Sequence, residues 1–387
     1  MKIIVLGTRG IPYIQGGVET HCQELYPRLV KLGFEVTLIT RTPYVQDKSK
    51  KVYKGVKLKH LFTPQKKSIE AITHTLLGIF YARLKNPDIL HIHSIGPSLM
   101  VPLARLLGLK VLVTNHGPDY ERQKWGKLAK KALILGEKLG TKYAHQVIVI
   151  SEVIRNILQT KYQRGDTALV YNGVTLPIKS EETDYIETLG LEKNNYMISV
   201  GRFVEEKGLN DLIEAYGKIN TEVKLVFVGD ADHKSQYSEQ LKKSAKENGI
   251  ILTGFIKGKQ LNEIFSHAKL FLMPSYHEGL PIALLEAMSY NLDVLVSDIP
   301  ANLEVTLDKK DYFEVGNIEK LSEKLEVKLR QNENRNFSSL IIEKYNWNII
   351  AQQTKEVYLY LIKGKSYEKN SVIITHKSKP NALGNQC

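Results

Sequence analysis

Two glutamates, Glu278 and Glu286, stand eight positions apart around a predicted turn. Two carboxylates at this spacing could bind a polar ligand through hydrogen bonds. The turn contains Gly279, which permits a tight backbone, and Pro281, which suits the first position of a helix. We therefore expect Glu278 on a loop and Glu286 about one and a half turns into the following helix. The free N–H groups at such a helix start form a site for phosphate. Carboxylates are repelled by phosphate, so this pair is better suited to accept hydrogen bonds from sugar hydroxyls. The alternative is one loop glutamate and one solvated helix glutamate.

Two cations follow a predicted buried strand at Tyr196–Val200. Arg202 and Lys207 stand just beyond the end of that strand, which is where open parallel sheets bind their ligands. A pair of fixed positive charges at this place is suited to clamping a diphosphate.

With both segments in view, the chain resembles the retaining glycosyltransferases of family 4, which have the GT-B fold. The matching motifs are G-R-x-x-x-x-K-G, from Gly201 to Gly208, and E-x7-E, from Glu278 to Glu286. They occur in the order that the family has. The resemblance covers roughly residues 1 to 362 and implies an α/β protein of two Rossmann-like parallel-sheet domains facing each other across a cleft. It also implies a nucleoside-diphosphate sugar as donor, no metal and no cofactor.

The resemblance implies a role for each residue of the two motifs. Arg202 and Lys207 would neutralise the leaving diphosphate, Glu286 would hold the ribose hydroxyls, and Glu278 would hold the sugar. Transfer would take place on the front face of the sugar, with the leaving phosphate oxygen taking the acceptor proton. The further donor-binding residues that it implies are Gly16, Gly17, Ile256, Gly279 and Leu280.

Two places in the first half of the chain could add to this site. Gly16 and Gly17 could let backbone N–H groups approach an anion before a predicted helix, although a flexible turn is the alternative. His116 ends a predicted strand, and the family has a histidine there, so the resemblance implies that His116 orients the sugar. His91 and His93 alternate on another strand, and without a third ligand in view we interpret them as packing or cleft-lining residues.

Predicted strands and helices alternate along the chain, which indicates parallel sheets covered by helices. We expect a first, acceptor-side domain over residues 1–174 and a polar linker over 175–195. A nucleotide-sugar-binding domain over 196–345 should follow. The resemblance implies that a helix over 346–362 packs back on the first domain. The basic segment 363–387 lies outside the resemblance and is expected to be disordered.

The composition narrows the classes of partner. The 387 residues carry a net charge of +13, which favours a nucleotide sugar, an acidic lipid surface or nucleic acid. Nucleic acid is disfavoured because the sequence has no C-x2-C zinc pattern, no phosphate-binding P-loop and no aromatic RNA-binding motif. A nicotinamide-dependent dehydrogenase is also disfavoured, because the glycines after the first strand lack the G-x-G-x-x-G spacing. Two cysteines and the lack of any sufficiently long apolar run fit a cytoplasmic protein.

One predicted helix, within residues 122–143, has large apolar residues at helical spacing with lysines between them. The spacing favours a stripe that faces the core and a solvated basic face. The alternative is a surface for anionic lipid or for a polyprenyl-diphosphate acceptor. The residues of that surface would be Lys124, Trp125, Lys127, Lys130 and Lys131.

These observations predict a retaining glycosyltransferase of hexosyltransferase type, acting on a lipid-linked glycan in bacterial cell-surface polysaccharide biosynthesis. Its product would be an O-antigen, a capsule or an exopolysaccharide, and it would associate peripherally with the inner face of the plasma membrane. Segments at Gly7–Pro12 and His116–Gly126 resemble a subset of the family that includes rhamnosyltransferases. The alternatives are a nucleotide-sugar epimerase of similar fold and a non-catalytic basic protein that binds membrane or nucleic acid.

Overall fold

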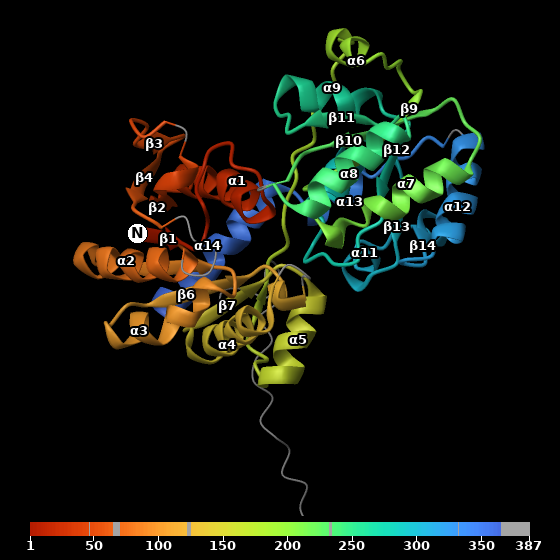
Figure 1. The fold of residues 1–387 in the computed structure, drawn as a ribbon. Coiled ribbons are helices and arrows are strands. Elements are labelled where there is room, and N and C mark those ends of the chain that lie inside the picture. Colours follow the sequence, from red (N-terminus) through yellow and green to blue (C-terminus); the bar gives the residue numbers. More distant parts are fainter. Residues whose placement is uncertain (46, 65–69, 122–124, 232–233, 332, 365–387) are drawn as a thin grey trace, which may run out of the picture.

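The computed structural model describes residues 1–45, 47–64, 70–121, 125–231, 234–331 and 333–364. Lys124 and residues 365–387 of the expected tail therefore lie outside the described residues. Two domains lie beside each other, each built around its own sheet, and the chain returns to the first domain at its end (Figure 1).

The first domain alternates strands and helices from its first residues. Its elements are β1 (Lys2–Leu6), α1 (Gly17–Lys31), β2 (Glu35–Arg41), η1 (Thr42–Tyr44), β3 (Val52–Tyr53), β4 (Val56–Leu61), α2 (Glu70–Lys85), β5 (Ile89–His93), η2 (Pro97–Met100), α3 (Val101–Leu106), β6 (Val111–Asn115), η3 (Asp119–Glu121), α4 (Lys127–Tyr143), β7 (Gln146–Val149), α5 (Glu152–Tyr162) and β8 (Ala168–Leu169). Its sheet has the strand order β3-β4-β2-β1-β5-β6-β7-β8, and only the described pair β3–β4 is antiparallel.

The second domain repeats this plan. Its elements are α6 (Asp184–Thr188), β9 (Tyr196–Val200), η4 (Glu205–Lys207), α7 (Leu209–Lys218), β10 (Lys224–Val228), α8 (Gln236–Glu247), β11 (Ile251–Gly254), α9 (Lys259–His267), β12 (Leu270–Met273), α10 (Ile282–Ser289), β13 (Asp293–Ser297), α11 (Pro300–Leu303), η5 (Lys309–Asp311), β14 (Tyr312–Phe313), α12 (Ile318–Arg330) and α13 (Ser338–Lys344). The strand order is β11-β10-β9-β12-β13-β14. The predicted GT-B architecture of two Rossmann-like parallel sheets is confirmed.

Buried apolar residues on both faces of β1 explain why helices cover both sides of the first sheet. Ile4 and Leu6 pack with residues of α2 and α3, whereas Ile3 and Val5 pack with residues of α1. The final helix, α14 (Trp347–Lys363), lies on the α1 side and packs against α1, although it follows the second domain in sequence (Figure 1).

The structure adds elements that the sequence pattern did not predict. The segment 175–195 contains α6, where the N–H groups of Tyr185 and Ile186 donate to the carboxylate of Glu263. This segment therefore packs on the second domain. The strand β4 was also not predicted, although its lysines alternate with apolar residues and its burial alternates with them, as in a half-buried strand near the edge of a sheet.

Candidate active site

The two domains meet at the carboxyl ends of their parallel strands. Gly279 lies so close to the first domain that a Cβ there would be 2.2 Å from the carbonyl oxygen of His116. Nδ1 of His277, in the same loop, lies 3.1 Å from a carboxylate oxygen of Glu121. The side-chain amide of Gln15 donates to the carbonyl of Asp230 across the same boundary. Sequence reasoning missed these last contacts because each joins residues that are far apart in the chain.

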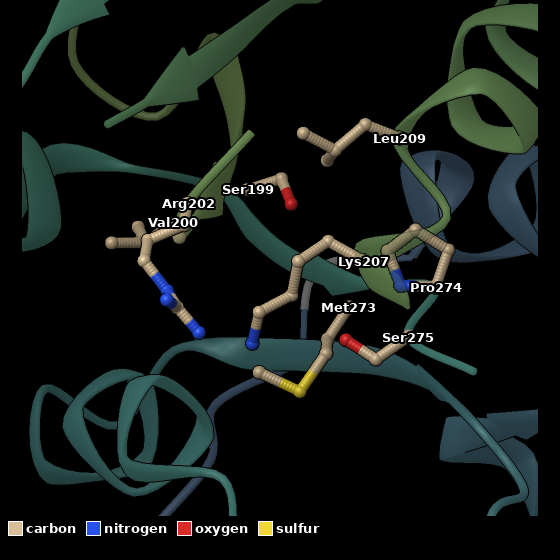
Figure 2. A pocket seen from close by; sticks show the side chains of 9 residues that line it. Ser199, Val200, Arg202, Lys207, Leu209, Met273, Pro274 and Ser275 are labelled. Atoms are coloured by element: carbon tan, nitrogen blue, oxygen red, sulfur yellow. The ribbon is translucent and has the colours of Figure 1, made fainter. Parts of the chain in front are cut away.

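Arg202 and Lys207 line a small cavity at the end of β9, and their side chains extend into the same space (Figure 2). Gly208 follows with a φ of 63°, and a Cβ there would lie 2.1 Å from the carbonyl oxygen of Pro274. Glycine is therefore required for the Lys207 segment to approach the loop that carries Glu278. The structure thus brings the two predicted motifs together.

Lys207 and Glu278 contact each other directly. Lys207 Nζ lies 2.5 Å from Glu278 Oε1, and the Ser275 hydroxyl donates to the same carboxylate oxygen over 2.8 Å. Both side chains are largely buried. This charge pair places one hydrogen-bond acceptor directly beside a cation that lines the cavity.

The loop after Glu278 leads into α10. Pro281 is the N-cap residue of this helix, whereas we expected it at the first helical position, so the helix begins one residue later than expected. Leu280 is buried, with its side chain in the hydrophobic core, and its carbonyl accepts a hydrogen bond from Asn172. Leu280 can therefore contribute to a ligand site only through its backbone. Ile256, after β11, is likewise buried in the core, so its backbone is the part that could contact a base.

Glu286 is half-buried on α10, as the spacing predicted. Burial raises the pKa of its carboxyl group to about 7, and repulsion from Glu24 on α1 adds to this effect. The carboxyl group is therefore poised between its neutral and ionised forms at neutral pH, and hydrogen-bond donors on a ligand would favour the ionised form.

Gly16 and Gly17 begin α1, with Gly16 at the N-cap and a φ of 146°. Space for a Cβ at Gly16 is taken by the side chains of Glu19 and Arg9. A Cβ at Gly17 would lie 4.0 Å from the side chain of Ile282, at the start of α10. The N-terminal ends of α1 and α10 therefore face each other across the domain boundary, and both favour negative charge.

His116 ends a chain of buried hydrogen-bonding groups. Its Nε2 lies 2.9 Å from Nδ1 of His93, whose Nε2 contacts the hydroxyl of Tyr26. The same hydroxyl lies 3.0 Å from Nδ1 of His91, which lies 2.7 Å from the hydroxyl of Tyr358 on α14. Burial lowers the pKa of His116 well below its usual range, and the neighbouring histidines contribute, so the imidazole is neutral at pH 7.

A third histidine, which the sequence reasoning missed, completes a cluster at this point. His21 on α1 joins His93 and His116, and one ring nitrogen from each lies within 4.8 Å of the others. Imidazoles in such a group can bind a transition metal. Here, however, His93 already contacts Tyr26 and His116, and Nδ1 of His21 lies 2.9 Å from the side-chain oxygen of Asn172.

The expectation that the apolar stripe of α4 faces the core is wrong. Leu128 is 83% exposed and Leu135 is 46% exposed. Lys127 and Lys131 are exposed on the same helix, Lys130 is half-buried, and Trp125 lies half-buried just before it. The buried residues of α4 are Gly136, Glu137, Gly140 and Thr141.

Two family profiles match consecutive parts of the chain. Residues 15–176 match Glycosyltransferase Family 4, and residues 181–339 match Glycosyl transferases group 1. Each of the two matches covers most of one of the two parallel-sheet domains. The chain is therefore a glycosyltransferase of the GT-B fold, of the family 4 and group 1 type.

Individual relatives share about a quarter of their residues with this chain over the matched segments. The chain is 27% identical over 311 residues to the putative teichuronic acid biosynthesis glycosyltransferase TuaC of Bacillus subtilis, over 73% of this chain and 76% of TuaC. It is 24% identical over 242 residues to the N,N'-diacetylbacillosaminyl-diphospho-undecaprenol alpha-1,3-N-acetylgalactosaminyltransferase of Campylobacter jejuni, over 58% of this chain and 63% of that enzyme. The solved structure of Anabaena HepE in complex with UDP and glucose is similar in fold, with a TM-score of 0.76 and 17% identity over 92% of this chain and 99% of HepE.

Proposed function

We propose that the protein is a retaining glycosyltransferase of hexosyltransferase type that moves a sugar from a nucleoside-diphosphate sugar to a lipid-linked glycan. Its pathway would be the biosynthesis of a bacterial cell-surface polysaccharide. The observation that carries the proposal is the meeting of Arg202, Lys207 and Glu278 at the start of α10, opposite His116.

The chemistry of these groups suits departure of a nucleoside diphosphate. Negative charge grows on the diphosphate as the bond to the sugar breaks, and Arg202, Lys207 and the helix N-terminus stabilise that charge. Glu286 accepts hydrogen bonds from the ribose, and Glu278 accepts them from the sugar. His116 orients the sugar from the first domain. The leaving phosphate oxygen takes the acceptor proton, so the proposal requires neither a protein base nor a metal.

The names of the relatives support the kind of donor and acceptor. HepE was solved with UDP and glucose, which supports a nucleotide sugar as donor. TuaC is named for teichuronic acid biosynthesis, and the Campylobacter enzyme for a diphospho-undecaprenol acceptor. A lipid-linked acceptor would place the protein at the inner face of the plasma membrane. Within the described residues, no helix is both long enough and apolar enough to cross a bilayer. For the sugar, the proposal keeps the resemblance to the subset of the family that includes rhamnosyltransferases.

A thermal-shift screen against UDP, GDP, dTDP, ADP and their sugars tests the donor. A ligand at about 100 times its dissociation constant should stabilise the protein by roughly 2.7 kcal/mol. The stabilising donor is then incubated with membrane lipid extract, and NMR of the product shows whether the anomeric configuration is retained. An isomerised sugar formed from the donor alone would identify an epimerase. No stabilisation by any nucleotide would favour a non-catalytic basic protein.

A further inference from the structure

The helix α4 packs on its domain through its small residues. A Cβ at Gly136 would lie 2.2 Å from the carbonyl oxygen of Ile95, and a Cβ at Gly140 would lie 2.6 Å from the Cβ of Ser98. Only glycine permits this close approach to the segment at η2. Glu137 lies between the two glycines and accepts a hydrogen bond from the buried hydroxyl of Tyr120. The inward face of α4 is therefore fixed, with Leu133 against Gly96, and Leu128 and Leu135 lie on the opposite, outward face.

The outward face of α4 combines apolar and basic residues. Leu128 is 83% exposed, Leu135 is 46% exposed and Ile134 is 43% exposed. The lysines beside them are also exposed: Lys127, Lys131, Lys138 and Lys142. An amphipathic helix of this kind, with its apolar face uncovered and lysines beside it, is typical of helices that lie in a membrane interface.

A second helix of the same domain has an uncovered apolar face. In α2, Leu77 is 40% exposed, Phe80 is 48% exposed and Leu84 is 84% exposed. Both α2 and α4 pack against η2, and Figure 1 shows α2, α3 and α4 on the same side of the first domain. We call the exposed residues of these helices the α2–α4 face. They are Leu77, Phe80 and Leu84 of α2, Leu106 of α3, and Leu128, Ile134 and Leu135 of α4 with its four exposed lysines.

We propose that the α2–α4 face docks on an anionic lipid bilayer. The leucines and Phe80 enter the boundary between headgroups and acyl chains, and the lysines contact lipid phosphates. Charge complementarity favours this occupant, because four exposed lysines on one helix attract an anionic surface and repel a basic partner. The proposal deepens the proposed function, since it places the face beside a lipid-linked acceptor, but docking itself requires no catalysis.

The start of α4 lies close in sequence to a residue at the candidate active site. The segment between His116 and Leu128 contains Glu121, which contacts His277 in the loop of the second domain that carries Glu278. A bilayer seated on Leu128 would therefore lie beside the domain boundary. An acceptor whose diphosphate lies at the bilayer surface could reach the site without leaving its membrane.

Co-sedimentation with vesicles tests the proposal without donor or acceptor, so its outcome is independent of the transferase assignment. The vesicles are phosphatidylcholine, alone or with about 30% phosphatidylglycerol, to vary the anionic surface. One variant carries Leu128→Gln and Leu135→Gln, which keep helix propensity and remove apolar area. Its matched control carries Val327→Gln and Ile342→Gln, which are 51% and 47% exposed on helices of the second domain. A third variant carries Lys127→Glu, Lys131→Glu and Lys138→Glu.

The wild type should bind anionic vesicles, and part of the binding should persist at about 0.5 M salt, where charge interactions are screened beyond roughly 4 Å. The leucine variant should lose the salt-resistant part, and its control should bind as the wild type does. The lysine variant should lose the preference for anionic vesicles, at about fivefold in partitioning for each lysine that contacts the surface. Equal binding by the leucine variant and its control would overturn the proposal. A second result would also overturn it: the wild type does not bind vesicles, and light scattering shows a dimer that the leucine changes dissociate. The face would then be an interface with a second copy of the chain.

Discussion

Lys207 and Glu278 form an ion pair in which Nζ and Oε1 are 2.5 Å apart. The residue that we propose binds the diphosphate, Lys207, is therefore paired with the residue that we propose binds the sugar, Glu278. The charge of Lys207 is partly neutralised by this contact. A diphosphate that binds Lys207 must therefore compete with a carboxylate of the same protein. The full donor brings a sugar whose hydroxyls can donate hydrogen bonds to Glu278, and the bare nucleotide does not. The effect of the competition should therefore differ between these two ligands.

We expect Glu278→Gln to strengthen binding of the bare nucleoside diphosphate while it lowers turnover. Removing the carboxylate charge makes Lys207 available, and a charge-assisted bond is worth roughly 1.5–3 kcal/mol, so affinity should rise about tenfold. Ser275→Ala is the matched control, because it removes only the hydroxyl that donates to the same oxygen. Calorimetry with the bare nucleotide measures the effect, and weaker binding to the Gln variant would contradict it.

Arg202→Ala and Lys207→Ala should each cost more in turnover than in substrate affinity. Their charges act on the leaving diphosphate, whose negative charge is greatest in the transition state. The loss of one charge-assisted bond predicts a decrease in kcat of about tenfold or more. Steady-state kinetics gives kcat and KM separately, and Lys218→Ala, which pairs with Glu319 on the surface, is the control. A kcat within about twofold of the wild type for both variants would remove these residues from the mechanism.

Glu286→Gln should stabilise the protein at alkaline pH and weaken nucleotide binding. Burial raises the pKa of this carboxyl group to about 7 in the folded protein from an ordinary value of 4.5. The folded state therefore holds a proton that the unfolded state has lost between these two values, so wild-type stability falls as the pH rises through this window. A Gln side chain does not ionise, so the variant does not lose stability in this way.

The gain in unfolding free energy should be near zero at about pH 4 and at most about 3 kcal/mol at about pH 8. Urea denaturation at both values measures it. Glu24→Gln is a useful comparison, since it removes only the smaller repulsion and should lower the pKa of Glu286 slightly. The same stability difference at both values would show that Glu286 ionises normally in the folded protein.

Local patterns predicted much of the fold and of the donor side of the site. Tyr196–Val200 and Leu270–Met273 are strands as expected, because short apolar runs before glycine or proline turns specify buried parallel strands locally. The two motifs after these strands then lie together, because parallel strands share one carboxyl edge. Glu286 is on its helix for the same local reason.

The remaining parts depend on contacts between distant segments. The spacing in α4 correctly indicated an amphipathic helix, but spacing alone does not say which face turns inward. The signal that was available is the pair Gly136 and Gly140, four positions apart, which marks a face that approaches backbone closely. His21 had no such signal, because it reaches His116 only through the packing of α1 on the sheet.

Chelation should leave turnover unchanged. His21, His93 and His116 lie close enough to hold a metal, but their ring nitrogens already contact Asn172, Tyr26 and one another. The assay compares the enzyme before and after extended dialysis against EDTA, with metal content measured in both samples. A loss of activity that zinc or manganese restores would contradict the metal-independent mechanism and assign the cluster to a metal.

We expect His93→Phe to lower kcat by about tenfold with little change in donor KM, because His116 would lose the partner that fixes its ring. Phenylalanine keeps the ring volume but cannot bond to Nε2 of His116, which lies 2.9 Å from His93. Neutral His116 can then carry its proton on either ring nitrogen, so only part of the population has the tautomer that donates to the sugar. His93→Gln, which retains a polar group near His116, should recover part of the loss.

Tyr358→Phe is the control for this prediction, because it removes a hydroxyl from His91 at the far end of the same hydrogen-bonded chain. Its effect on kcat should be smaller than that of His93→Phe, since the contact between His93 and His116 remains. NMR of labelled histidine would show a single His116 tautomer in the wild type and a mixture in the His93→Phe variant. A single unchanged tautomer together with a reduced kcat would mean that His93 acts through packing instead.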